Sequence, residues 1–457
     1  MAVLFTSFWF HTETPRSGAF SRRRPLYRVR IHSRRVSYQR AVEHLSTISV
    51  CSDMIRGLSP FATPIMAKQG YTMNENYLSR RPCPVCEGCE GSALAQLCYA
   101  LFDDLKMSGY KTLIQCSTCG MLYDDVHFSD NQLQEYYRRN EHYAVSSMGG
   151  SGSVSKDNKE RYQRIIDLLE PGSHGVILDF GCGQGGFISQ CLHYGLKAFG
   201  IEPSAKSREV AEKAGLHVYE SIGSFLTKDP TCKVQAIVFS HVLEHMMNPL
   251  SLIRVFAQYA HDALVYIEVP DADSYLSPKA VRWQEMYFEH LSHFRRQHIA
   301  ELARRSCIEI KKEGEIPFSQ LQKDIRCRFI VGRFTAKQKL TEVSAFSDHE
   351  HDPTSQLPFV SVENIPEDDR PLALWGVSQY AMLLLGSYPD LSRRILRLFD
   401  ASPAKIGRRI KGIVIESSKE LGTLTEDFIL LIPKSNSLSQ MRSLLPGTGF
   451  RGKVVEV

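Results

Sequence analysis

The stretch GVILDFGCGQGGFISQCLHYGLKAFGIEPS, residues 175–204, decides the fold. Val176–Leu178 form the short apolar run of a buried strand, the glycines that follow turn the chain, and Phe187–Tyr194 continue as a helix. Ala198–Ile201 then make a second strand. The stretch therefore predicts a βαβ unit, the building block of a doubly wound parallel sheet.

The glycine-rich turn between these strands has the layout of a nucleotide site. Gly181, Gly183 and Gly185 lack a Cβ atom where a ligand must lie against the backbone. Glu202 ends the second strand, where a carboxylate can accept hydrogen bonds from both ribose hydroxyls. Asp179 ends the first strand, and its charge favours a ligand with an ammonium group over one with a pyrophosphate. S-adenosylmethionine carries an ammonium group and no phosphate, so it is the favoured ligand.

The segment Asp179–Gly185 (DFGCGQG) closely resembles the first motif of class I S-adenosylmethionine-dependent methyltransferases. Residues 234–253 (VQAIVFSHVLEHMMNPLSLI) look like the fourth strand and following helix of that family, and residues 264–274 (LVYIEVPDADS) look like its fifth strand. The resemblance implies the ribose position for Glu202 and a further cofactor contact for Ser240.

Two positions complicate this resemblance. Gln235 stands where the fourth strand usually opens with Asp, and the adenine-contacting position falls on either Glu220 or Ser221. The same glycine turn also satisfies the G-x-G-x-x-G pattern of NAD(P) sites. An NAD(P) site and a purely structural βαβ unit therefore stay as alternatives.

Two Cys-x-x-Cys pairs precede the βαβ unit. Cys83 and Cys86 lie in RPCPVCEGCEG, and Cys116 and Cys119 lie in LIQCSTCGMLYDD. This spacing lets each pair aim two sulfurs at one ion and matches a four-thiolate zinc site, in which Cys89 could substitute for one ligand. Such a site is coordinatively closed, so the zinc is expected to be structural. Four free thiols and a redox pair are the alternatives.

The segment Trp283–Phe294 (WQEMYFEHLSHF) follows the expected fifth strand, where substrate loops commonly sit. It places Tyr287, Glu289, His290 and His293 close together, which offers a hydroxyl donor, an acid and a base. Histidine titrates nearest working pH, and an adjacent Glu can orient it or hold its proton. The alternative is a polar helix start whose side chains satisfy one another.

The order of these features resembles that of nucleotide-sugar C-methyltransferases, which alkylate the carbon beside a ketone in deoxysugar biosynthesis. The shared order is a four-cysteine zinc domain, a methyltransferase domain, a Y-x-E-H segment and an α/β tail. The resemblance implies catalytic roles for Tyr287, Glu289 and His290, with His290 as the favoured base. It also implies active-site roles for His245 in the LEH step and for a tyrosine after the zinc domain, most nearly Tyr143.

Several residues keep a second interpretation. His245 also fits the structure of a helix start, and His241 fits a core or cofactor-side position better than a substrate contact. In the tail, Asp400 follows Gly376 at a spacing that suggests a nucleotide site, but only one glycine remains in that turn. The resemblance implies that the tail helps to wall the sugar-nucleotide cleft, and a structural or oligomerising module is the alternative.

The expected fold class is α/β, a Rossmann-like class I methyltransferase domain with a small zinc-binding domain before it and a Rossmann-like domain after it. The likeness to the C-methyltransferases covers nearly all of residues 80–457. The expected domains are a basic extension at residues 1–70, a zinc-binding domain at 71–145, the methyltransferase domain at 146–345 and the C-terminal domain at 346–457.

Charge and composition narrow the function. Residues 1–70 hold 11 Lys and Arg against 3 Asp and Glu, whereas the rest of the chain holds 44 against 47, so no general nucleic-acid surface is expected. We interpret the basic extension as translation assigned too far upstream, with a disordered tail or an organelle transit segment as alternatives. No run of about 18 apolar residues occurs, and isolated cysteines suit a reducing compartment. The protein is therefore expected to be soluble and cytoplasmic, with no membrane partner.

The leading hypothesis is a methyltransferase that acts on the carbon beside a ketone of a nucleotide-linked sugar, a small-molecule substrate. One alternative transfers the methyl group to an oxygen of a sugar or another small metabolite. A second alternative is a non-catalytic, zinc-bearing scaffold that binds nucleic acid, which the acidic body disfavours. The oligomeric state stays open.

Overall fold

The computed structural model describes residues 74–139, 156–172, 174–275, 286–317, 326–335, 362, 364–433 and 438–457. Two expectations from the sequence lie outside these residues. They are the basic extension at residues 1–70 and the position of Tyr143.

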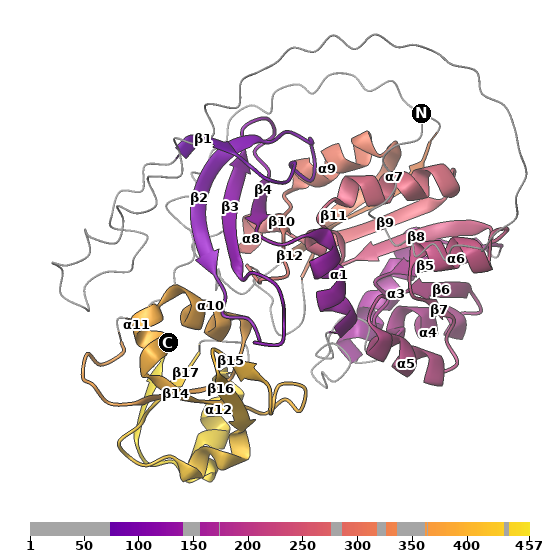
Figure 1. Cartoon of the computed structure of the whole chain (residues 1–457). Coiled ribbons are helices and arrows are strands. Elements are labelled where there is room, and N and C mark those ends of the chain that lie inside the picture. Colours follow the sequence, from indigo (N-terminus) through magenta and orange to yellow (C-terminus); the bar gives the residue numbers. More distant parts are fainter. Residues whose placement is uncertain are drawn as a thin grey trace, which may run out of the picture. The chain divides into compact units, whose positions relative to one another are not determined.

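The central element is a seven-stranded sheet with the strand order β11-β12-β9-β8-β5-β6-β7 (Figure 1). Its parallel strands are β5 (Val176–Phe180), β6 (Lys197–Ile201), β7 (Val218–Tyr219), β8 (Val234–Ser240) and β9 (Leu264–Pro270). The antiparallel strands β11 (Ile308–Pro317) and β12 (Arg326–Phe334) extend it at one edge. The βαβ unit predicted from residues 175–204 is confirmed, with α4 (Gly186–His193) between β5 and β6.

Helices cover both faces of this sheet (Figure 1). On one face, α3 (Lys156–Leu169) and α4 pack apolar side chains such as Ile165 and Phe187 against the strands. On the other face lie α6 (Ile222–Lys228), α7 (Pro249–Tyr259) and α9 (Arg296–Arg305). The remaining helices of this region are α5 (Ala205–Lys213) and α8 (Ala272–Tyr275). Because both faces are covered, consecutive residues of the central strands are buried, as in β5, instead of every second residue.

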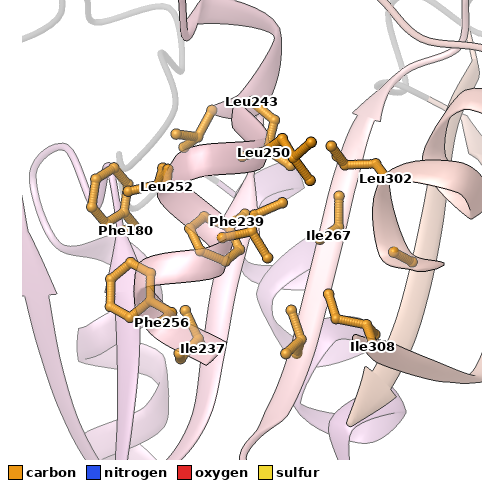
Figure 2. Packing of buried hydrophobic residues seen from close by; sticks show 14 of the residues in the cluster. Phe180, Ile237, Phe239, Leu243, Leu250, Leu252, Phe256, Ile267, Leu302 and Ile308 are labelled. Atoms are coloured by element: carbon orange, nitrogen blue, oxygen red, sulfur yellow. The ribbon is translucent and has the colours of Figure 1, made fainter. Parts of the chain in front are cut away.

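Helix α7 illustrates how the sequence specifies these layers. Asn248 caps its first turn, since Oδ1 accepts the Ser251 N–H at 3.1 Å. Leu250 and Phe256 point from the helix toward strand residues such as Phe239 (Figure 2). All three side chains are 0% exposed. Burial of a side chain of this size contributes about 1.5–3 kcal/mol to stability.

An antiparallel sheet with the order β1-β2-β3-β4-β10 contains the N-terminal part of the described chain. Four of its strands follow one another: β1 (Asn74–Leu78), β2 (Glu90–Cys98), β3 (Tyr110–Cys116) and β4 (Leu122–Val126). The fifth, β10 (Ser292–His293), comes from the segment between β9 and α9 and pairs with β4. Helix α1 (Asp130–Arg139) follows β4. We call this element the first sheet.

A third sheet has the order β15-β16-β14-β13-β17-β18. Its strands are β13 (Leu372–Trp375), β14 (Ile395–Asp400), β15 (Arg409–Ile410), β16 (Ile413–Ser417), β17 (Ile429–Ile432) and β18 (Lys453–Glu456), and all but β15 run parallel. Its helices are α10 (Gln379–Ser387), α11 (Pro389–Arg394) and α12 (Leu438–Leu444). The expected α/β class is confirmed. Within the described ranges, no helix combines the length and apolar character needed to cross a membrane.

Candidate active site

The glycine turn after β5 is tightly packed. Gly181 has a φ of +73°, and a Cβ atom there would lie 2.7 Å from Cγ2 of Val242. Its N–H donates to the Ile201 carbonyl at 2.8 Å. Only glycine adopts this conformation in so little space without strain. The contact also shows that the turn after β5 lies directly beside the segment that follows β8.

The carboxylate of Glu202 is held by the backbone around this turn. Its Oε2 accepts the Gly183 N–H at 2.9 Å, and its Oε1 accepts the Ser204 N–H at 2.8 Å. Burial raises the pKa of Glu202, although both hydrogen bonds oppose the rise. Each carboxylate oxygen has a second lone pair. Glu202 is therefore fixed in place and can still accept hydrogen bonds from a ribose.

Asp179 is a buried acid in β5, with 6% of its surface exposed. Burial raises the pKa of Asp179 to about 8; Arg161 opposes this rise and Glu202 adds to it. A buried carboxylate becomes ionised more easily when a cation approaches it. The site therefore suits the ammonium group of S-adenosylmethionine.

Polar side chains gather where β8 ends. The Oγ of Ser240 is buried and has no hydrogen-bond partner among the described residues. His241 has a φ of +56°, its Nε2 lies 3.0 Å from Oε1 of Glu268, and its Nδ1 lies 3.4 Å from Oε1 of Glu244. Burial lowers the pKa of His241, but Cys327, Glu244 and Glu268 raise it well above its usual value. These neighbours therefore favour the protonated form of His241, and its contact with Glu268 ties the segment after β8 to β9.

The rings of His245 and His290, two of the predicted site residues, lie against each other. His245 belongs to the 3₁₀ turn Leu243–His245, and its ring centroid lies 4.7 Å from that of His290. The ring of Tyr287 lies 5.0 Å from the His290 ring, and the Glu289 carbonyl lies 3.2 Å from Nδ1 of His245. The structure thus brings Tyr287, Glu289, His290 and His245 into one group.

Two tyrosines of α1 join this group. The Tyr137 hydroxyl lies 3.1 Å from Nδ1 of His245, and the Tyr136 hydroxyl donates to the Glu289 carboxylate. Burial, followed by the charge of Glu289, raises the pKa of Tyr136 and the pKa of Tyr137 well above the usual value. Both phenols are therefore neutral; Tyr136 donates a hydrogen bond to Glu289, and Tyr137 keeps a hydroxyl proton. The sequence pointed most nearly to Tyr143, which lies outside the described residues.

A buried ion pair of the first sheet holds the backbone of the predicted catalytic segment. Lys111 on β3 contacts Asp124 on β4 at 2.5 Å, and both side chains are 0% exposed. The Lys111 ammonium also donates to the carbonyls of Tyr287 at 2.8 Å and His290 at 3.1 Å. His293 Nε2 lies 3.5 Å from Oδ2 of the same Asp124. His293 therefore belongs to this support.

The four predicted zinc ligands converge. The sulfur of Cys83 lies 3.6 Å from that of Cys119, the sulfur of Cys86 lies 3.4 Å from that of Cys116, and all four lie within 4.8 Å of one another. A tetrahedral site with zinc–sulfur bonds of about 2.3 Å has sulfur–sulfur edges of about 3.8 Å. The cluster therefore fits a four-thiolate zinc ion. Cys89 is exposed and outside the cluster.

In the third sheet, Asp400, whose spacing from Gly376 suggested a nucleotide site, bonds to other residues of the chain. Asp400 Oδ2 accepts the Val377 N–H at 2.8 Å and lies 3.3 Å from the ammonium of Lys405. A Cβ atom at Gly376 would lie 3.1 Å from Cε of Met441. Unlike Glu202, Asp400 already has an ammonium partner within the chain, which argues against a second nucleotide site there.

Comparison with known proteins agrees with the geometry of the glycine turn. Residues 154–306 match a family model described as a methyltransferase domain. This region is therefore similar to methyltransferase domains. It contains the predicted cofactor residues and the Tyr287–His290 segment, and it leaves the four cysteines and the third sheet outside its bounds.

The relatives that match this region are distant. An uncharacterized methyltransferase of Anoxybacillus flavithermus is 30% identical over 104 residues, which cover 22% of this chain and 49% of that protein. The uncharacterized methyltransferase YrrT of Bacillus subtilis is 30% identical over 113 residues, which cover 23% and 53%. The chain thus spans about half the length of these relatives. A crystal structure of a methyltransferase from Archaeoglobus fulgidus aligns with a TM-score of 0.31 and 15% identity over 38% of this chain and 92% of that one.

Sequence reasoning missed five residues that the structure brings to the site. They are Lys111, Asp124, Tyr136, Tyr137 and Glu244. The tyrosine pair was visible as part of an aromatic run after the cysteines. Charged residues in an antiparallel strand normally lie on its solvent-exposed face. The sequence pattern therefore gave no sign that Lys111 and Asp124 form a buried ion pair.

Proposed function

We propose that the chain is an S-adenosylmethionine-dependent methyltransferase that alkylates the carbon beside a ketone of a nucleotide-linked deoxysugar. The observation that carries the proposal is the group of His290, His245 and Glu289 with Tyr136 and Tyr137. An oxygen acceptor needs only a weak base. A carbon beside a ketone needs both a base and donors that stabilise an enolate, and this group contains both.

His290 is the general base of the proposed reaction. It takes a proton from the carbon beside the ketone, and the electron pair of that C–H bond forms the enolate. The enolate carbon attacks the methyl group in line, the S–CH₃ bond breaks, and its electron pair stays on sulfur. Tyr287 and Tyr137 supply hydroxyl donors for the enolate oxygen. Loss of one such preorganised donor typically lowers kcat by about 10²–10³-fold.

S-adenosylmethionine supplies the electrophilic methyl group as cosubstrate. We assign its ribose hydroxyls to Glu202 and its ammonium group to Asp179, while Gly181 and Gly183 let it approach the backbone and Ser240 adds a polar contact. Three observations support the assignment: the fixed carboxylate of Glu202, the raised pKa of Asp179 and the buried, unpartnered Oγ of Ser240.

The flanking regions have supporting roles in this proposal. The four cysteines hold a structural zinc ion, and the C-terminal domain helps to wall the cleft. The Phe288 N–H donates to Oε1 of Gln379 in α10 at 3.4 Å, and the Phe288 ring belongs to the same hydrophobic cluster as α10. None of the cysteines in the described ranges forms a disulfide, which supports a cytoplasmic location.

Carbon NMR tests the proposal with the full-length protein, methyl-labelled S-adenosylmethionine and a panel of nucleotide-linked keto-deoxysugars. We expect a product methyl with the shift of a carbon-bound group. A methoxy shift would favour O-methylation, and transfer to none of the panel would contradict the sugar substrate. His290→Ala should lose turnover and keep its affinity for the cofactor, whereas loss of both would indicate a structural histidine.

A further inference from the structure

Glu244 is a buried carboxylate in the middle of the candidate site. It lies in the 3₁₀ turn Leu243–His245 and is 1% exposed. Neither of its oxygens accepts a hydrogen bond from the residues that the structure describes. Buried carboxylates are otherwise almost always hydrogen-bonded, so this exception calls for an explanation.

The contact between Glu244 and His241 supplies only part of that explanation, because it involves one oxygen of the carboxylate. His241 Nδ1 lies 3.4 Å from Oε1 of Glu244, whereas His241 Nε2 lies closer, at 3.0 Å, to Oε1 of Glu268. The Tyr266 hydroxyl donates to the other oxygen of Glu268 at 2.6 Å. His241 therefore contacts the two acids through different ring nitrogens, and its contact with Glu244 is the longer one. The Oε2 atom of Glu244 keeps no hydrogen-bond partner among the described residues.

The other side of Glu244 faces the predicted base. One Glu244 oxygen, one ring nitrogen of His245 and one ring nitrogen of His290 lie within 4.8 Å of one another. The Leu291 N–H donates to the Glu244 carbonyl at 2.7 Å and ties the 3₁₀ turn to the loop that carries His290. An opposite charge at such a distance favours the protonated form of an imidazole.

We propose that Glu244 is a positioning residue that acts through His290, because its carboxylate stabilises the imidazolium formed when His290 takes the substrate proton. The inference rests on the proposed function, in which the proton of the C–H bond moves to His290 and its electron pair forms the enolate. After methyl transfer, the imidazolium releases that proton to solvent. Glu244 exchanges no proton in this step.

Other groups also set the charge around His290, and every element packed against it contributes some of them. Lys111 donates to the His290 carbonyl rather than to the ring, so its charge lies on the backbone side. The titratable and charged residues linked by contacts to His290 or its loop are Lys111, Asp124, Tyr136, Tyr137, His245, Tyr287, Glu289 and His293. Glu244 differs from the carboxylates of Asp124, Glu268 and Glu289 because each of those accepts a hydrogen bond or a close ion pair.

NMR titration of histidine rings in the full-length protein tests this inference without a substrate. The spectrum of a His290→Asn variant assigns the His290 signal. In Glu244→Gln, the pKa of His290 should fall by about one unit or more, and Glu244→Asp should give a smaller fall. Glu301→Gln is the matched control, because Glu301 is a buried acid that pairs with Arg304 on α9.

Three outcomes separate the explanations. A His290 signal that titrates identically in folded Glu244→Gln would overturn the inference. The inference would also be overturned if the protein bound a second equivalent of Zn²⁺ in addition to the one at the cysteine cluster, and if Glu244→Gln lost that second equivalent. Glu244 would then be a metal ligand. A shifted His290 pKa in a protein that methylates no keto-sugar would uphold the inference and contradict the proposed substrate instead.

Discussion

Lys111→Met tests whether the first sheet holds the loop that carries Tyr287 and His290. The substitution keeps the length of the side chain but removes the ammonium group from a place where both Lys111 and Asp124 are 0% exposed. Asp124 then keeps the contact with His293 at 3.5 Å, and its Oδ1 already has no partner among the described residues. Removing one partner of a buried ion pair costs about 3–5 kcal/mol of unfolding free energy.

A double variant separates stability from function. Adding Asp124→Leu to Lys111→Met removes the uncompensated charge, and a hydrophobic pair of similar volume is often neutral or stabilising. The double variant should therefore recover about 2 kcal/mol or more of the loss. It should not recover turnover, because the carbonyls of Tyr287 and His290 still lack the donor that fixes the loop.

Urea unfolding followed by circular dichroism, with zinc present, measures the shift of the midpoint at constant m. Lys312→Met is the control, because Lys312 and its partner Glu170 are 43% and 72% exposed. Such an exposed pair is screened by solvent and contributes little to stability. A loss for Lys111→Met no larger than that of the control, or a double variant with full turnover, would refute the reasoning.

Three further predictions concern the metal, the cofactor and the phenols. A strong chelator should abolish methyl transfer and spare cofactor binding, since the cysteines support the first sheet. Measurement of the metal content and calorimetry of cofactor binding check this. Equal loss of methyl transfer and cofactor binding would contradict it. At pH 7, cofactor binding should release a proton, because the Asp179 carboxyl with a pKa of about 8 must ionise to meet the ammonium group. Calorimetry in buffers of different ionisation enthalpy should show that Asp179→Asn loses this proton release. Because the pKa of Asp179 is raised in the folded state, the free energy of unfolding of the unmutated protein should fall as the pH rises toward 8. Asp179→Asn should lack that fall. Tyr137→Phe should lower kcat by about 10²-fold with an unchanged cofactor Kd, whereas the control Tyr194→Phe, at a residue that is 51% exposed, should change neither.

The sequence predicts well those parts of the fold whose contacts are local. The turn at Gly181, the strand before it and the acid at Glu202 all lie in one short stretch, so their pattern alone indicates the βαβ unit. The tyrosine contacts are different: Tyr137 and His245 are 108 residues apart, and the hydroxyl of Tyr136 reaches across 153 residues. Such contacts depend on how α1 packs, which no local pattern encodes. The catalytic roles themselves stay predictions until kinetics test them.

The pairing of β10 with β4 has a consequence for synthesis of the chain. Ser292 is 169 residues beyond its partner Tyr123. At about 5–20 residues per second, a ribosome needs about 8–34 s to make the intervening chain. During that interval the edge of β4 has no neighbour on that side, and open strand edges invite pairing with other chains. Chaperone binding to the first sheet during synthesis should therefore reduce aggregation most strongly before the segment that contains β10 leaves the ribosome.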